Sequence, residues 1–136
     1  MHSKSETPKP AAAARAAAET VAVFAHTSLD AHRIALEALV RGDAIARRLP
    51  RGYGPLRNQL SRALQSAYLQ TGEGAAKSGA ERRARLGSAR AEAGEAACAL
   101  EAVVALGLGS RERCHAVIVL LSRLCATLTG LCKAAG

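Results

Sequence analysis

The amino-acid sequence predicts an all-α fold: an antiparallel up-down-up-down four-helix bundle with a flexible N-terminal extension. The composition is rich in alanine and leucine and includes only two Tyr, one Phe and no Trp, which favours helices over sheets. Apolar residues recur every three or four positions in four successive segments, and proline or glycine lies between most of them. Four helices joined by short turns pack most simply as an up-and-down bundle. We place this single domain at residues 28–136.

Residues 1–27 are predicted to form a disordered or partly helical tail. The first segment, MHSKSETPKP, is polar and includes two prolines. The alanine-rich stretch that follows has Arg15 and Glu19 at i, i+4 spacing but no stripe of large apolar side chains to bury. The same two charged residues interrupt the only candidate apolar region of a secretory signal, so we expect no leader peptide.

The first helix is expected to begin near Ser28 or Asp30 and to run to Arg48. Ser28 is a good N-cap, and the carboxylate of Asp30 favours the positive end of the helix dipole. Pro50 and Gly52 then end the helix.

The second helix is expected to begin at Pro55, which suits the first turn of a helix. Its apolar stripe runs from Leu56 through Ala67 and approximately Tyr68, and Gly72 and Gly74 are expected to end it. On this prediction Glu73 follows the end of the helix.

The third helix is predicted to start at Ser78, because Ser78 and Glu81 have the spacing of a capping box, and to run to about Leu106. The fourth helix starts after Ser110 and has the strongest apolar periodicity in the chain. Apolar residues outside the main stripes of the first and fourth helices are either scattered surface residues or a subunit interface. We expect the interface, because a bundle this small cannot bury helices that are apolar nearly all round. On the fourth helix these extra residues are Val119 and Leu120.

A set of short motifs extends from the turn before the second predicted helix into the third. It begins with a proline turn and a Tyr-Gly pair, continues with a Gln-Leu-x-Arg-Ala run, and ends in a Glu-Gly pair and a later Gly-Ser-x-x-x-Glu. In this chain the motifs are Leu49-Pro50, Tyr53-Gly54-Pro55-Leu56, Gln59-Leu60-Ser61-Arg62-Ala63, Ser66, Glu73-Gly74, and Gly87-Ser88 with Glu92.

In these motifs the chain resembles the bacterial four-helix-bundle family of 23S rRNA intervening-sequence proteins, over roughly residues 29–134. It departs from the family pattern at Ser61, Gln70 and Thr71-Gly72. The resemblance implies a non-enzymatic homo-oligomer, a pentamer packed as a ring or barrel. It also extends to the accessory variability determinant proteins of diversity-generating retroelements, which are basic and work with a reverse transcriptase and its RNA. The structural motif residues it implies are Tyr53, Gln59, Glu73, Gly74, Ser88 and Glu92.

The charge balance predicts an anionic partner. The chain has 19 Lys+Arg against 11 Asp+Glu, a net charge of +8, and most of the cations are arginines, whose planar fork suits phosphate. In an antiparallel bundle the first and third turns lie at one end and the second turn at the other, so the arginines divide between two basic ends. The nucleic-acid-binding candidates are Arg47, Arg48, Arg51, Arg57, Arg62, Arg111 and Arg113 at the first end, and Arg82, Arg83 and Arg85 at the second.

Two functions are compatible with these patterns. The first is a ribonucleoprotein accessory that binds RNA, in preference to DNA, through its basic ends. The second is a protein–protein assembly module without a nucleic-acid role, in which the arginines form a solvated face or pair with glutamates of a neighbouring subunit. Tyr53 either stacks on a base or packs on the helix ends, and we expect Glu73 and Glu92 to be structural rather than catalytic.

We expect neither an enzyme nor a cofactor, because no phosphate-binding loop, dinucleotide fingerprint, nucleophile elbow or triad is present. No metal is expected, since the adjacent Cys114 and His115 point about 100° apart on a helix and no zinc-ligand spacing occurs. The four cysteines lie at helix-face spacings, so we expect them to pack as small apolar residues and to form no disulfide framework. This usage of cysteine is typical of a reducing cytoplasm. No apolar run approaches the roughly 18 residues of a membrane span, so no membrane association is expected.

Overall fold

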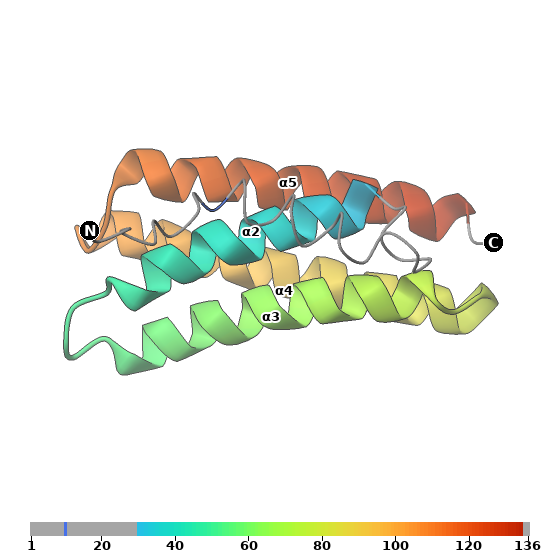
Figure 1. The fold of residues 1–136 in the computed structure, drawn as a ribbon, viewed down its shortest axis with the longest axis horizontal. Helices are drawn as coiled ribbons and strands as arrows, with labels where there is room; N and C mark the ends of the chain where they lie inside the picture. Colours follow the sequence, from blue (N-terminus) through green and yellow to red (C-terminus); the bar gives the residue numbers. More distant parts are fainter. Residues whose placement is uncertain (1–9, 11–29, 135–136) are drawn as a thin grey trace, which may run out of the picture.

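The computed structural model describes Pro10 and residues 30–134, and the described chain is helical with short turns between helices. The helices are α2 (Asp30–Arg47), α3 (Gly54–Ala75), α4 (Gly79–Ala105) and α5 (Arg111–Ala134). Each helix packs against two others, α2 against α3 and α5, and α4 against α3 and α5, which closes a ring around one core. Figure 1 shows the four helices side by side and antiparallel, which confirms the predicted fold class. The predicted tail, including Ser28, lies outside the described residues apart from Pro10.

The core consists of leucine layers separated by alanine. Alanine faces the core at Ala35 and Ala38 of α2, Ala63 of α3 and Ala93 and Ala96 of α4, all essentially inaccessible to solvent. Because alanine has no side chain beyond Cβ, these positions allow the helix backbones to approach closely and leave room for leucine from the facing helix. The largest fully buried apolar side chains are Leu60, Leu64, Leu86, Leu100, Leu121, Leu124 and Leu128.

The predicted end of the second helix is wrong. Helix α3 continues through Gly72 and Gly74 to Ala75, so Glu73 lies inside the helix rather than after it. Gly74 is buried against α4, and a Cβ atom built on it would lie 2.6 Å from Leu86 Cδ2 and 2.9 Å from Leu86 Cγ. This glycine therefore allows two helices to approach closely, and the packing outweighs the low helix propensity of glycine.

The turns follow from local sequence, with one exception. Gly52 (φ 101°) and Gly107 (φ 70°) adopt the left-handed conformation that glycine tolerates, at the α2–α3 and α4–α5 turns. At the start of α4, however, the predicted capping box does not form, because the Ser78 side chain makes no capping hydrogen bond. The Glu81 carboxylate lies 3.9 Å from Lys77 Nζ instead of reaching back to the Ser78 backbone.

Helix α5 corrects two expectations. Leu120 is buried although it was placed outside the main stripe, because α2 and α4 flank α5 on both sides and cover a wider arc of it; Val119 remains 44% exposed. The segment Arg111–Lys133 is also long and apolar enough to cross a membrane by length and composition alone, with a mean hydropathy of 1.7 and one third of its most apolar window buried. The expectation that no segment approaches that length was therefore wrong, because valine, isoleucine and leucine dominate this segment and charged residues are few in its most apolar window.

Candidate nucleic-acid interface

The fold brings two turns to one end of the bundle. The α2–α3 turn and the α4–α5 turn both lie at the left of Figure 1, and the α3–α4 turn lies at the right. We call the end of the bundle with the α2–α3 and α4–α5 turns the basic end. It comprises the C-terminal turn of α2, the α2–α3 turn and the first turn of α5. It includes Arg47, Arg48, Arg51, Arg111 and Arg113, which come from two segments far apart in the sequence.

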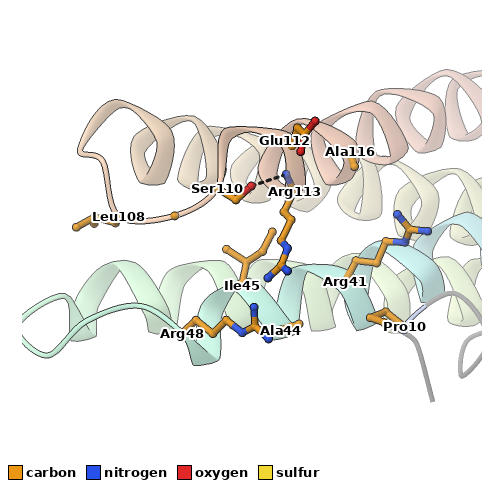
Figure 2. A pocket seen from close by; sticks show the side chains of 11 residues that line it. Pro10, Arg41, Ala44, Ile45, Arg48, Leu108, Ser110, Glu112, Arg113 and Ala116 are labelled. Carbon is orange, nitrogen blue, oxygen red and sulfur yellow. Dashed lines mark hydrogen bonds between the residues drawn. The ribbon is translucent and has the colours of Figure 1, made fainter. Parts of the chain in front are cut away.

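A pocket of about 640 Å³ opens at the basic end between α2 and α5. Three arginines line it: Arg41 from α2, Arg48 from the turn directly after α2, and Arg113 from α5. Figure 2 shows the Arg113 side chain extending from α5 toward α2, close to Ile45, while the Arg41 side chain lies farther along α2. We call these eleven residues the basic pocket: Pro10, Arg41, Ala44, Ile45, Arg48, Leu108, Gly109, Ser110, Glu112, Arg113 and Ala116.

Local contacts hold the arginines of the pocket in place. A guanidinium nitrogen of Arg41 lies 3.2 Å from a carboxylate oxygen of Glu37, one helical turn earlier. The backbone N–H of Arg113 donates to the side-chain oxygen of Ser110 at 3.2 Å, the hydrogen bond of an N-cap. Ser110 thereby fixes the start of α5 and the direction in which Arg113 leaves it.

Several of the predicted arginines are engaged within the bundle. Arg57 donates to the backbone carbonyls of Leu49 at 2.8 Å and Ala46 at 3.3 Å, and so satisfies carbonyls at the C-terminal end of α2. Arg47 donates to the Asp43 carboxylate at 2.7 Å. These contacts turn two cationic side chains toward their own chain.

Arg62 is held by two glutamates of α4. One of its guanidinium nitrogens lies 2.5 Å from Glu95 and the other 3.2 Å from Glu92, and the hydrogen bonds to Glu92 and Glu95 raise the pKa of Arg62 above its ordinary value. Gln59 donates to the same Glu95 at 3.0 Å. Glu92, predicted to be structural, therefore joins α4 to α3 within one chain.

The remaining motif residues continue this line of contacts. Glu73 of α3 lies 3.6 Å from the Arg85 guanidinium of α4, one residue before the Gly74–Leu86 contact. Motifs that are far apart in the sequence thus meet along one polar strip between α3 and α4. Ser88 lies exposed on α4, and Tyr53 is half-exposed at the basic end, directly before α3.

The arginines that stay unpaired are concentrated at the basic end. Within the described part of the chain, no side-chain ion pair involves Arg48, Arg51, Arg111 or Arg113. At the opposite end, Arg85 pairs with Glu73, Lys77 with Glu81, and Arg82 is half-buried. Arg83, the remaining candidate there, also makes an interaction. The two basic ends that the sequence predicted therefore differ in unpaired positive charge.

Arg41 was missed by the sequence analysis. It lies seven residues before Arg48, a spacing that brings two residues to the same helix face, and this spacing was the available signal. Its role in the pocket depends on the neighbouring α5, which no local pattern in α2 reveals. The apolar wall formed by Ile45, Leu108 and Ala116 was likewise visible only after α2 and α5 were paired.

The three cysteines of α5, Cys114, Cys125 and Cys132, are buried or partly buried as small apolar residues, whereas Cys98 of α4 is exposed and departs from that expectation. Burial raises the pKa of the Cys114 and Cys125 thiols, which lowers their thiolate fraction at neutral pH. Cys125 donates to the Arg90 carbonyl at 3.7 Å. Among the residues that the structure describes, no three His, Cys, Asp or Glu side chains are grouped to hold a metal ion.

Comparison with known proteins adds no assignment to this geometry. No protein-family model matches the chain, and no curated protein matches it. The resemblance to the intervening-sequence proteins therefore stays a prediction based on the motifs, and the function has to be argued from the basic end itself.

Proposed function

We propose that this chain is a non-catalytic, homo-oligomeric four-helix bundle that binds nucleic acid through its basic end, with RNA preferred. The observation that carries the proposal is the grouping of Arg48, Arg51, Arg111 and Arg113, exposed and without ion pairs in the described chain. Cations in this arrangement neutralise phosphates and release condensed counterions, which drives binding to nucleic acid. A net charge of +8 extends the attraction beyond direct contact.

The proposed interface is smaller than the ten arginines suggested by the sequence. Arg57 and Arg62 are engaged by α2 carbonyls and by α4 glutamates, so they shape the bundle instead of meeting a ligand. The opposite end has fewer unpaired cations and is assigned no primary role. The preference for RNA, the pentameric state and a reverse-transcriptase partner rest on the motif resemblance alone.

Homo-oligomerisation is supported by apolar surface that the single chain leaves exposed. Val119 of α5 and Leu69 of α3 are 44% and 56% exposed, and two thirds of the most apolar window of α5 is not buried. Large apolar side chains left exposed in a small domain support an interaction surface. The same surface suits the alternative function, an assembly module that binds another protein and no nucleic acid.

A charge-matched pair of variants tests the proposal. The first variant changes three arginines of the basic end to glutamine, Arg48, Arg51 and Arg111. The control changes three exposed arginines elsewhere in the bundle, Arg33, Arg90 and Arg123, and so removes the same charge. Binding of a labelled single-stranded RNA is followed by fluorescence anisotropy over a salt series.

The basic-end variant is expected to lose affinity and to reduce the slope of log K against log salt by about 2, at about 0.7 per lost phosphate contact. The control is expected to keep the wild-type slope. Equal losses in both variants would show that the binding depends on net charge and not on the basic end. No binding by the wild-type protein at low salt would leave the assembly module as the function.

A further inference from the structure

The basic pocket differs from the rest of the basic end because it is concave and partly apolar. Its volume of about 640 Å³ lies within the range of cavities that hold one small ligand. Arg51 and Arg111, by contrast, are exposed on the surface and are not among the pocket residues. Surface arginines suffice to neutralise a phosphate backbone, so the pocket offers something more than backbone contact.

The apolar wall is built from rigid helices. Ala44 and Ile45 come from α2, Ala116 from α5, and Leu108 from the turn that precedes α5. Ile45 is only 8% exposed and belongs to the hydrophobic core, so its position is fixed by packing. A flat apolar group can lie on this wall and exclude water from it.

The polar part of the pocket consists mainly of cations. Arg41, Arg48 and Arg113 line it against one acidic residue, Glu112. The Arg41 Nε–H is buried and has no hydrogen-bond acceptor in the described structure, although the other end of the guanidinium lies beside Glu37. Buried donors normally have an acceptor, and an anion drawn to Arg41 can supply one once the guanidinium turns toward it.

These features select among ligand classes. Three arginines exclude a metal cation, and a free inorganic anion makes no use of the wall formed by Ile45 and Ala116. A base pair in a duplex is stacked and cannot reach the wall, whereas an unpaired base can stack on aliphatic surface and on guanidinium planes. A nucleotide carries both the flat group and the phosphate that the pocket suits.

We infer that the basic pocket binds one unpaired nucleotide, with the base on the Ile45–Ala116 wall and the phosphate held by Arg41, Arg48 and Arg113. The inference rests on the proposed function and deepens it: the exposed arginines bind the backbone, and the pocket makes the protein prefer single-stranded or unpaired nucleic acid to a duplex. The same chemistry is offered by a free nucleoside monophosphate, so free nucleotides compete for the site.

The test uses the full chain and a substitution that fills the pocket without changing its charge. Ala116→Phe adds a side chain to the wall, and Ala126→Phe makes the same change at an exposed position on the same helix. Both variants are first checked for wild-type helicity and thermal midpoint. Affinity is then measured for single-stranded RNA, duplex RNA and adenosine 5′-monophosphate, with adenosine and inorganic phosphate as partial ligands.

Ala116→Phe is expected to weaken binding of adenosine 5′-monophosphate and single-stranded RNA about tenfold, the loss of one stacked base, and to leave duplex binding unchanged. Ala126→Phe is expected to behave as the wild type. If Ala116→Phe fails to fold, Ala44→Leu, which also enlarges a side chain of the wall without changing its charge, replaces it with the same expectation.

The failures of the two proposals are distinguishable. If the mononucleotide does not compete with RNA and Ala116→Phe binds RNA with wild-type affinity, the nucleotide site in the basic pocket is contradicted. Nucleic-acid binding through the basic end is then retained. Mononucleotide binding without RNA binding would keep the pocket and overturn the proposed function. Inorganic phosphate competing as well as adenosine 5′-monophosphate would show that the wall does not contribute, which also overturns the inference.

Discussion

Gly74 offers a quantitative test of how α3 and α4 pack. In Gly74→Ala the new Cβ meets Leu86 Cδ2 at 2.6 Å and Cγ at 2.9 Å, and Leu86 is fully buried. Either the leucine changes rotamer or the helices separate, and overpacking of this kind costs about 1–3 kcal/mol. Alanine in a helix interior is also more favourable than glycine by about 1 kcal/mol. The net destabilisation expected of Gly74→Ala is therefore about 0–2 kcal/mol.

Gly94→Ala is the matched control. Gly94 is exposed inside α4, and a Cβ built on it meets no atom within 4 Å, so only the propensity gain of about 1 kcal/mol remains. The propensity contribution cancels when the two variants are compared, and their difference measures the packing cost of about 1–3 kcal/mol. For a domain of this size that difference corresponds to thermal midpoints about 4–12 °C apart.

The assay is urea and thermal unfolding followed by far-ultraviolet circular dichroism. Both variants are measured at one protomer concentration, because oligomer formation makes the midpoint depend on concentration. Equal stability of Gly74→Ala and Gly94→Ala would refute the close α3–α4 contact, and with it the reason given for a glycine at this motif position.

Three further predictions concern side chains with assigned contacts. Arg57→Met is expected to lower the unfolding free energy by about 1–2 kcal/mol in urea unfolding, since it removes charged hydrogen bonds to the end of α2, and unchanged stability would contradict the cap. Arg62→Gln is expected to leave the salt slope of RNA binding at the wild-type value, because Glu92 and Glu95 already hold the guanidinium. A reduced slope in anisotropy titrations would assign Arg62 to the interface. Cys98 is expected to react with a thiol reagent before Cys114, whose pKa is raised by burial, and peptide mapping after brief N-ethylmaleimide labelling checks the order.

The number of helices and their approximate limits could be predicted from the sequence because the signals are local. Pro50 and Gly52 stop one helix, and apolar periodicity defines the others. The end of α3 could not be predicted in this way, since the same residue type, glycine, stops a helix or permits close packing. At Gly74 the deciding factor is Leu86, which belongs to another helix.

The candidate site shows the same limit more strongly. Arg48 and Arg57 look equivalent in the sequence, as two arginines near one turn. In the structure Arg57 folds back onto the carbonyls of Ala46 and Leu49, whereas Arg48 faces the pocket shared with α5. Which arginine is available depends on contacts between distant segments, and sequence patterning within one segment does not report them.

The most direct test of the central claim, nucleic-acid binding through the basic end, is a salt titration of the wild-type protein with single-stranded RNA and with duplex DNA. Four unpaired arginines at the basic end predict a single-strand slope of about −3, which is about a 50-fold loss of affinity between 50 mM and 200 mM salt. Binding through the basic end is expected to give this slope and tighter binding of RNA than of duplex DNA. A slope near zero, or no binding at the lowest salt, would contradict it.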